Sequence, residues 1–179
     1  MIGVKKNCKG ITLLEILIAI SIFSVALIGA IGLFVSLIKN QQALLDRAYV
    51  LNTLSYTTEY MSKAIRMAQK DTSASCIGSM ENFVLTGSSN IKFLNYNNEC
   101  QEFFLENQVL KVRKFGVAQN LTPASIIVEG LTFVLSGQSQ DDTFQPKVSF
   151  SIKAKVATSA APSFLIQTTV SQRMLDIAY

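Results

Sequence analysis

The longest apolar stretch of the chain lies near its N-terminus. Residues 16–38 contain no charged residue and no proline, and a helix of that length crosses a hydrocarbon core of about 30 Å. The helical pattern begins at Ile11 and continues to about Gln69, since the first proline of the chain is Pro123. We therefore predict a transmembrane helix over residues 11–38 that continues into the next segment.

The segment 39–70 has a different pattern. Apolar and small residues recur there at steps of three or four, while charged residues fall mostly between them. Such spacing is typical of an amphipathic helix that covers one face of a sheet. The residues of the predicted buried stripe are Val50, Leu54, Thr57, Met61, Ala64, Ile65 and Ala68.

The remainder, residues 71–179, reads mainly as β-strands. Residues 147–156 alternate apolar and polar positions, which predicts a half-buried strand, and Asn107 with Gln108 has the spacing of a hairpin turn. We expect one antiparallel sheet of about five to seven strands and an α+β fold, with the long N-terminal helix packed on the sheet. The candidate strands are 83–86, 91–94, 102–106, 109–113, 126–128, 131–135, 147–156 and 164–170.

The distribution of charge predicts the orientation in the membrane. Lys5, Lys6 and Lys9 precede the apolar run, and the first cation after it is Lys39. Because basic flanks stay in the cytoplasm, the N-terminus is expected inside and residues 39–179 outside the cytoplasm. Without these three lysines the 16 basic residues of the chain fall to 13, against 12 acidic ones. This near-neutral balance argues against a strong nucleic-acid patch, although a nucleic-acid partner stays open.

Two of the three cysteines, Cys76 and Cys100, lie in the predicted exported part, where disulfides persist. A bridge between them closes a loop of about 25 residues and is worth about 3–4 kcal/mol in the chain-entropy model. Two reduced and buried cysteines are the alternative, since spacing alone does not bring two sulfur atoms together.

The residues needed for most enzymatic chemistry are missing from the sequence. The chain has no histidine, so it has no Ser-His-Asp or Cys-His nucleophile system, and it has neither a P-loop nor a GxGxxG motif. Asp141 and Asp142 offer oxygen ligands for calcium, but a solvated loop is the favoured reading. We predict a non-enzymatic protein with no cofactor and no metal site.

One carboxylate does not fit a plain membrane anchor. Glu15 stands at the start of the apolar run, and no basic residue occurs between Lys9 and Lys39. A charge at the bilayer centre costs about 2.5–3.5 kcal/mol on insertion scales, and less near the interface. A cleaved secretory signal has a shorter apolar core, and a simple single-pass anchor leaves Glu15 without an explanation.

The stretch KGITLLEILIAI resembles the class III signal peptide of type IV pilins and type II secretion pseudopilins. Gly10 corresponds to the last leader residue, and the residues Thr12 to Glu15 correspond to the family core; Ile11 stands where Phe or Met is usual. The resemblance implies a leader of residues 1–10 whose recognition involves Lys5, Lys6 and Lys9. It also implies cleavage between Gly10 and Ile11 by a prepilin peptidase, with methylation of the new amine.

The same resemblance implies a function. The hairpin FFLENQVLKVR and the C-terminal stretch SFLIQTTVSQRMLDI look like those of larger minor pilins and pseudopilins, including the J-type pseudopilin. A structural subunit of a type IV pilus or of a secretion or competence pseudopilus is implied, held in the bacterial inner membrane before assembly into a filament. Its implied partners are other pilin subunits, the prepilin peptidase, the assembly platform and the lipid bilayer.

Glu15 would then be an assembly residue. Cleavage leaves a cationic α-amine at Ile11, with a reference pKa of about 7.7–8.0, and a neighbouring subunit's amine is the implied partner of the carboxylate. A pair within one chain and a protonated Glu15 are the alternatives. The alternative function is a membrane-anchored adhesin or DNA receptor that uses a pilin-type leader.

Overall fold

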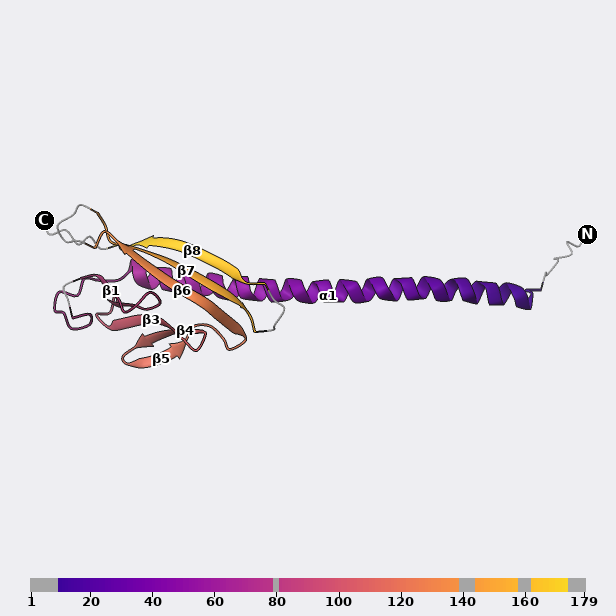
Figure 1. Ribbon diagram of the computed structural model, residues 1–179, viewed down its shortest axis with the longest axis horizontal. Coiled ribbons are helices and arrows are strands. Elements are labelled where there is room, and N and C mark those ends of the chain that lie inside the picture. The colour runs from indigo at the N-terminus through magenta and orange to yellow at the C-terminus, as the bar shows by residue number, and fades with distance from the viewer. Residues whose placement is uncertain (1–9, 79–80, 139–143, 158–161, 174–179) are drawn as a thin grey trace, which may run out of the picture. The chain divides into compact units, whose positions relative to one another are not determined.

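The computed structural model describes residues 10–78, 81–138, 144–157 and 162–173. Three of the predicted leader residues, Lys5, Lys6 and Lys9, and the calcium candidates Asp141 and Asp142 lie outside these ranges. In order along the chain, the elements are one helix, α1, followed by eight strands, β1 to β8 (Figure 1). The predicted α+β class, with a long N-terminal helix and antiparallel sheets, is confirmed.

Helix α1 spans Leu13–Arg66, close to the predicted range of 11 to about 69. It ends at Arg66 because the backbone then turns to a different partner: the Gln69 N–H donates to the Leu94 carbonyl oxygen at 2.9 Å. The chain divides into two compact units, Met1–Leu44 and Leu45–Tyr179. They are described separately below.

In the first unit, every described residue of the helix is exposed. Its large apolar side chains include Ile22, Phe23 and Leu33, each more than 60% exposed. A helix that is apolar around its whole circumference suits lipid or the interior of an assembly rather than water. Among the described residues, this is the one helix long and apolar enough to cross a membrane.

The second unit contains two antiparallel sheets. The first sheet has the order β1-β2-β3-β4-β5, and the second has the order β6-β7-β8. Backbone hydrogen bonds link the two sheets, from Val128 N to Gln108 O and from Phe133 N to Ser88 O, both at 2.9 Å. The strand bounds are β1 Phe83–Leu85, β2 Ile91–Leu94, β3 Cys100–Glu106, β4 Val109–Lys114, β5 Val117–Asn120, β6 Ile126–Ser136, β7 Lys147–Val156 and β8 Phe164–Ser171.

The prediction of one sheet with five to seven strands was wrong, since the described residues form two sheets with eight strands in all. Two of the candidate strands also differ from those observed. The predicted strands 126–128 and 131–135 form one strand, β6, because the register shifts between Val128 and Gly130 and so accommodates a bulge at Glu129. Strand β5 was missed, since its four residues are all exposed and show no alternation. The ends of β2 and β7 are those predicted.

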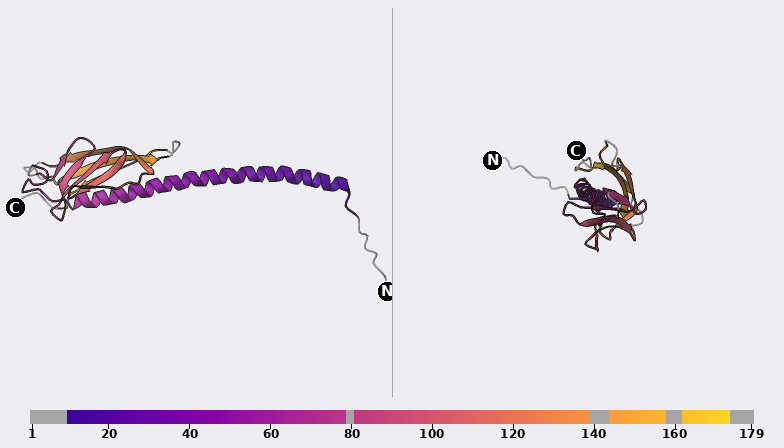
Figure 2. Two further views of the ribbon diagram at one scale, coloured as in Figure 1. Left: turned by 90° about the horizontal axis from the view of Figure 1, so that it is seen from below. Right: turned by 90° about the vertical axis from the view of Figure 1, so that its left-hand side faces the viewer.

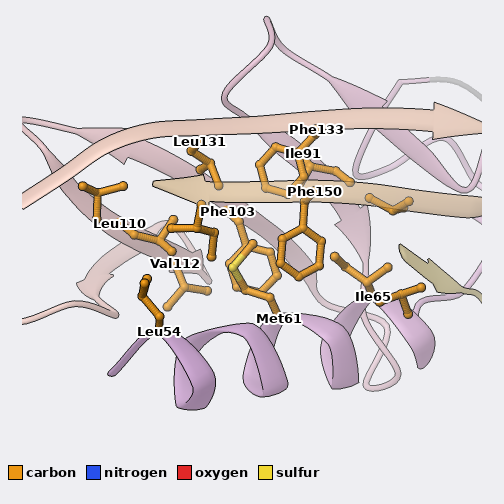
Figure 3. Packing of buried hydrophobic residues seen from close by; sticks show 14 of the residues in the cluster. Leu54, Met61, Ile65, Ile91, Phe103, Leu110, Val112, Leu131, Phe133 and Phe150 are labelled. Atoms are coloured by element: carbon orange, nitrogen blue, oxygen red, sulfur yellow. The ribbon is translucent and has the colours of Figure 1, made fainter. Parts of the chain in front are cut away.

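The core of the second unit forms where α1 meets both sheets. Of the predicted stripe, Val50, Leu54, Thr57, Met61, Ile65 and Ala68 are all buried, and Ala64 packs against them. Figure 3 shows Leu54, Met61 and Ile65 on the helix face that points toward the strands, where Phe103 and Phe150 meet them. The right-hand view of Figure 2 shows the strands on one side of the helix.

Candidate functional site

The candidate site is the start of α1. Thr12 is the N-cap of the helix: its carbonyl oxygen accepts from the Glu15 N–H at 3.1 Å, and its Oγ1 accepts from the same N–H at 3.3 Å. A threonine cap satisfies a helix donor that would otherwise lack a partner. The helix therefore begins at Leu13, and Glu15 occupies its third position.

The Glu15 carboxylate is free to accept a partner. In a full capping box, the glutamate at the third position reaches back to the N–H of the cap, but within the described residues the Glu15 side chain has no hydrogen bond and no ion pair. Its place in the first turn does favour a negative charge, since the helix N-terminus carries a partial positive charge. The helix dipole thus explains part, but not all, of how the carboxylate is tolerated.

Gly10 and Ile11 precede the helix and are exposed, Ile11 by 72%. A Cβ atom built at Gly10 meets nothing within 4 Å. The chain itself therefore does not require glycine at this position, and a requirement for glycine would have to come from another molecule.

Two of the three serine hydroxyl groups inside the apolar run are satisfied by the helix itself. Ser21 Oγ donates to the Leu17 carbonyl oxygen at 2.8 Å, and Ser24 Oγ donates to the Ile20 carbonyl oxygen at 2.7 Å. This bonding removes the cost of placing two hydroxyl groups in lipid. Glu15 is the one charged side chain of residues 13–38, and it has no partner on its own helix.

The two predicted disulfide cysteines are adjacent in the structure. The Sγ atoms of Cys76 and Cys100 are 2.06 Å apart, and the bridge joins the segment after α1 to the start of β3. The segment between α1 and Cys76 also carries a buried carboxylate, Asp71, which the sequence analysis did not single out.

Asp71 organises the backbone that leads to Cys76. Burial opposes ionisation of this carboxyl group, but its oxygens accept from the backbone N–H groups of Ile77, Cys76 and Ser75. These bonds, with one from the Ser73 hydroxyl, lower the pKa of Asp71 to about 2. The group is structural, because every partner is a neighbour along its own segment.

The comparisons with known proteins address the N-terminal segment. A family model described as the prokaryotic N-terminal methylation motif matches residues 5–31. The chain carries the N-terminal methylation motif typical of type IV pilins and pseudopilins. The searches of curated proteins and of solved structures each found no match.

The motif and the fold together describe a pilin-like protein. The matched range includes Gly10, Thr12 and Glu15, and it ends within the apolar run. Proteins with this motif are in general structural rather than enzymatic, and the motif with its hydrophobic helix fits anchoring in the inner membrane before assembly. Prepilin peptidase processing and pilus assembly partners are implied by the motif.

Thr12 is the part of this site whose structural role the sequence analysis missed. The signal was present, since Thr12 and Glu15 form the S/T-x-x-E pattern that precedes an apolar helix. The sequence analysis found no motif at Asp71, although its donors lie only two to six residues further along the chain. They gather around the carboxylate when the loop after α1 closes.

Proposed function

We propose that the protein is a minor pilin or pseudopilin, a structural subunit that assembles into or primes a type IV pilus or a secretion or competence pseudopilus. The observation that carries the proposal is the exposed apolar start of α1, with an unpartnered Glu15 inside the methylation motif. Such a surface is stable only in lipid or against other apolar helices. A filament core of packed helices supplies the second environment.

Processing at Gly10 supplies the missing partner for Glu15. Cleavage between Gly10 and Ile11 by a prepilin peptidase releases an α-amine, which is cationic near neutral pH, and methylation keeps it basic. Lys5, Lys6 and Lys9 present the leader on the cytoplasmic face. In the membrane, a carboxylate with a nearby cation is far less costly than one without it.

Assembly then depends on which amine Glu15 meets. In a filament, subunits are staggered along the axis, so a carboxylate one turn into the helix can reach the N-terminus of a neighbour. The carboxylate thereby fixes the axial register of the incoming subunit. Residues 11–38 build the filament core, and residues 39–179, outside the cytoplasm, contact other minor subunits.

The mature N-terminus tests the processing step. We expect mass spectrometry of the protein from its native host to show a chain that begins at N-methylated Ile11. Gly10→Val should abolish cleavage, and because a Cβ at Gly10 has free space, the loss would reflect the peptidase rather than the fold. A native chain that still begins at Met1 contradicts the proposal and favours a membrane-anchored binding module.

The assembly role of Glu15 needs a second experiment. Glu15→Ala should remain processed and inserted in the membrane but should be absent from sheared filaments or from cross-linked subunit complexes. Asp46→Ala removes an exposed carboxylate further along α1 and should behave as wild type. Normal incorporation of Glu15→Ala contradicts the assembly role even when cleavage is confirmed.

A further inference from the structure

A cavity of about 440 Å³ lies where the C-terminal part of α1 meets the first sheet. Tyr60, Lys63 and Met67 line it from the helix side, while Gln101 of β3 and Lys114 of β4 line it from the sheet. The volume falls within the range of small-molecule sites. All of these residues belong to the second unit, so the cavity does not depend on the N-terminal motif.

Gln101 lines this cavity and carries a hydrogen-bond donor that has no acceptor. Asn95 Oδ1 accepts the backbone N–H groups of Asn97 and Glu99, at 2.9 and 3.0 Å, so Asn95 must direct its NH₂ group the other way. That NH₂ group donates to Gln101 Oε1 at 3.3 Å, which fixes the orientation of the Gln101 amide. The Gln101 Nε2 atom is left without an acceptor although the residue is only 2% exposed.

The same cavity carries unpaired positive charge. Within the described residues, neither Lys63 nor Lys114 has an ion pair. Lys114 instead lies over the Tyr60 ring, with Nζ 5.5 Å from the ring centroid. Glu99 contacts this network only through Asn95 and does not line the cavity. The C-terminal end of α1 carries a partial negative charge, which disfavours a nearby anion. This effect is reduced because the carbonyl oxygens of Lys63 and Arg66 already accept hydrogen bonds from the N–H groups of Met67 and Arg173.

We propose that this cavity binds the carboxylate of a small organic acid or of an acidic side chain. One carboxylate oxygen accepts from Gln101 Nε2, and the negative charge lies between the Lys63 and Lys114 ammonium groups. The apolar part of the ligand packs on Met67 and on the Tyr60 ring. Among the described residues, Gln101 Nε2 and the Lys63 ammonium group have no other partner, while the Tyr60 ring contacts Phe103 and the Lys114 ammonium group.

The test uses the full-length protein in detergent and 4-fluorobenzoate as the probe, whose fluorine relaxation reports binding. We expect Lys63→Gln combined with Lys114→Gln to weaken binding at least tenfold. Lys147→Gln, at an exposed position of β7 in the other sheet, is the matched control and should bind as wild type. Gln101→Glu keeps the shape of the side chain, removes the donor, and should also abolish binding.

Two further probes test whether the ligand must be negatively charged and whether its carboxylate belongs to a small acid or to an acidic side chain. The neutral 4-fluorobenzamide, which has the same shape, should not bind; a signal equal to that of 4-fluorobenzoate overturns the proposal. A capped peptide with a single glutamate that displaces the probe assigns the site to an acidic side chain, and failure to displace it assigns the site to a small acid. The proposal is also overturned by absence of 4-fluorobenzoate binding, or by binding that the double lysine variant leaves unchanged.

Discussion

Asp71 shows how a single buried carboxylate makes the fold sensitive to acid. Its side chain is fully buried, and three backbone N–H groups hold the pKa near 2, below the ordinary value of 3.8. A depressed pKa contributes stability above the unfolded value and loses it as the pH falls through the folded value. This contribution is therefore present at neutral pH and disappears between about pH 4 and pH 2.

The Asp71→Asn variant tests this dependence. The amide cannot accept from every N–H group that the two carboxylate oxygens serve, so the variant should lose about 1–3 kcal/mol at neutral pH. Unfolding free energies from urea titrations should differ most above pH 4, and the two curves should approach each other near pH 2. Parallel curves over this range would mean that another group causes the acid sensitivity.

The turn between β3 and β4 stores local backbone strain. Asn107 and Gln108 have φ values of +51° and +61° and join strands whose last pair is Glu106 with Val109. A residue with a side chain pays about 1–2 kcal/mol in this region, whereas glycine does not. Gln108→Gly should therefore raise the unfolding free energy by about 0.5–1 kcal/mol, measured by urea titration.

The control for this change is the same substitution in a strand. Gln119→Gly, in the exposed strand β5, removes a side chain without relieving a positive φ. It should lower stability slightly, since glycine weakens a strand interior. An equal gain in both variants would show that the hairpin turn is not the source of the effect.

At the scale of elements, the second unit depends on the buried stripe of α1. Met61 is fully buried within the cluster that unites the helix with both sheets. Met61→Ala should lower the unfolding free energy by about 2–5 kcal/mol, because it removes buried methylene groups and leaves a cavity. The control Ser55→Ala, at an exposed position of the same helix, should change the unfolding free energy little. A loss smaller than 1 kcal/mol for Met61→Ala would mean that the sheets hold together without the helix.

The two strands whose ends the sequence predicted, β2 and β7, each pair with another strand on both sides. Strand β7 lies between β6 and β8 and alternates strictly, so both of its ends could be predicted. Strand β6 was divided in two because Gly130 looked like a break, whereas it pairs with Lys153 beside a bulge. Strand β5 pairs only with β4, and its four exposed residues show no alternation from which a strand could be predicted.

For the whole molecule, the two candidate sites differ in how far the sequence reveals them. Gly10, Ile11 and Glu15 lie within one helical turn or just before it, so their relation is local and a motif records it. Lys63, Gln101 and Lys114 come from three different elements, and only the packing of α1 on β3 and β4 brings them together. Sequence reasoning placed Gln101 on no predicted strand at all, because it lies just before the predicted start at residue 102.

For the whole molecule, the proposed membrane orientation predicts that the N-terminal lysines affect formation of the distant disulfide. We expect basic flanks to keep the N-terminus in the cytoplasm, and the Cys76–Cys100 bridge to form only when the second unit is exported to an oxidising compartment. In a Cys8→Ser background, changing Lys5, Lys6 and Lys9 to glutamine should therefore increase the fraction of chains whose two remaining cysteines are reduced. Alkylation with a maleimide polymer, read as a mass shift on a gel, measures this fraction.

The matched control removes the same number of lysines from the part of the chain that is expected outside the cytoplasm. Lys63, Lys114 and Lys147 have no ion pair among the described residues, and changing all three to glutamine preserves the difference in charge across the apolar run that sets orientation. This variant should stay as fully oxidised as wild type. If both triple variants gave the same alkylation pattern, the leader lysines would not set the orientation, and the disulfide would have to form independently of export.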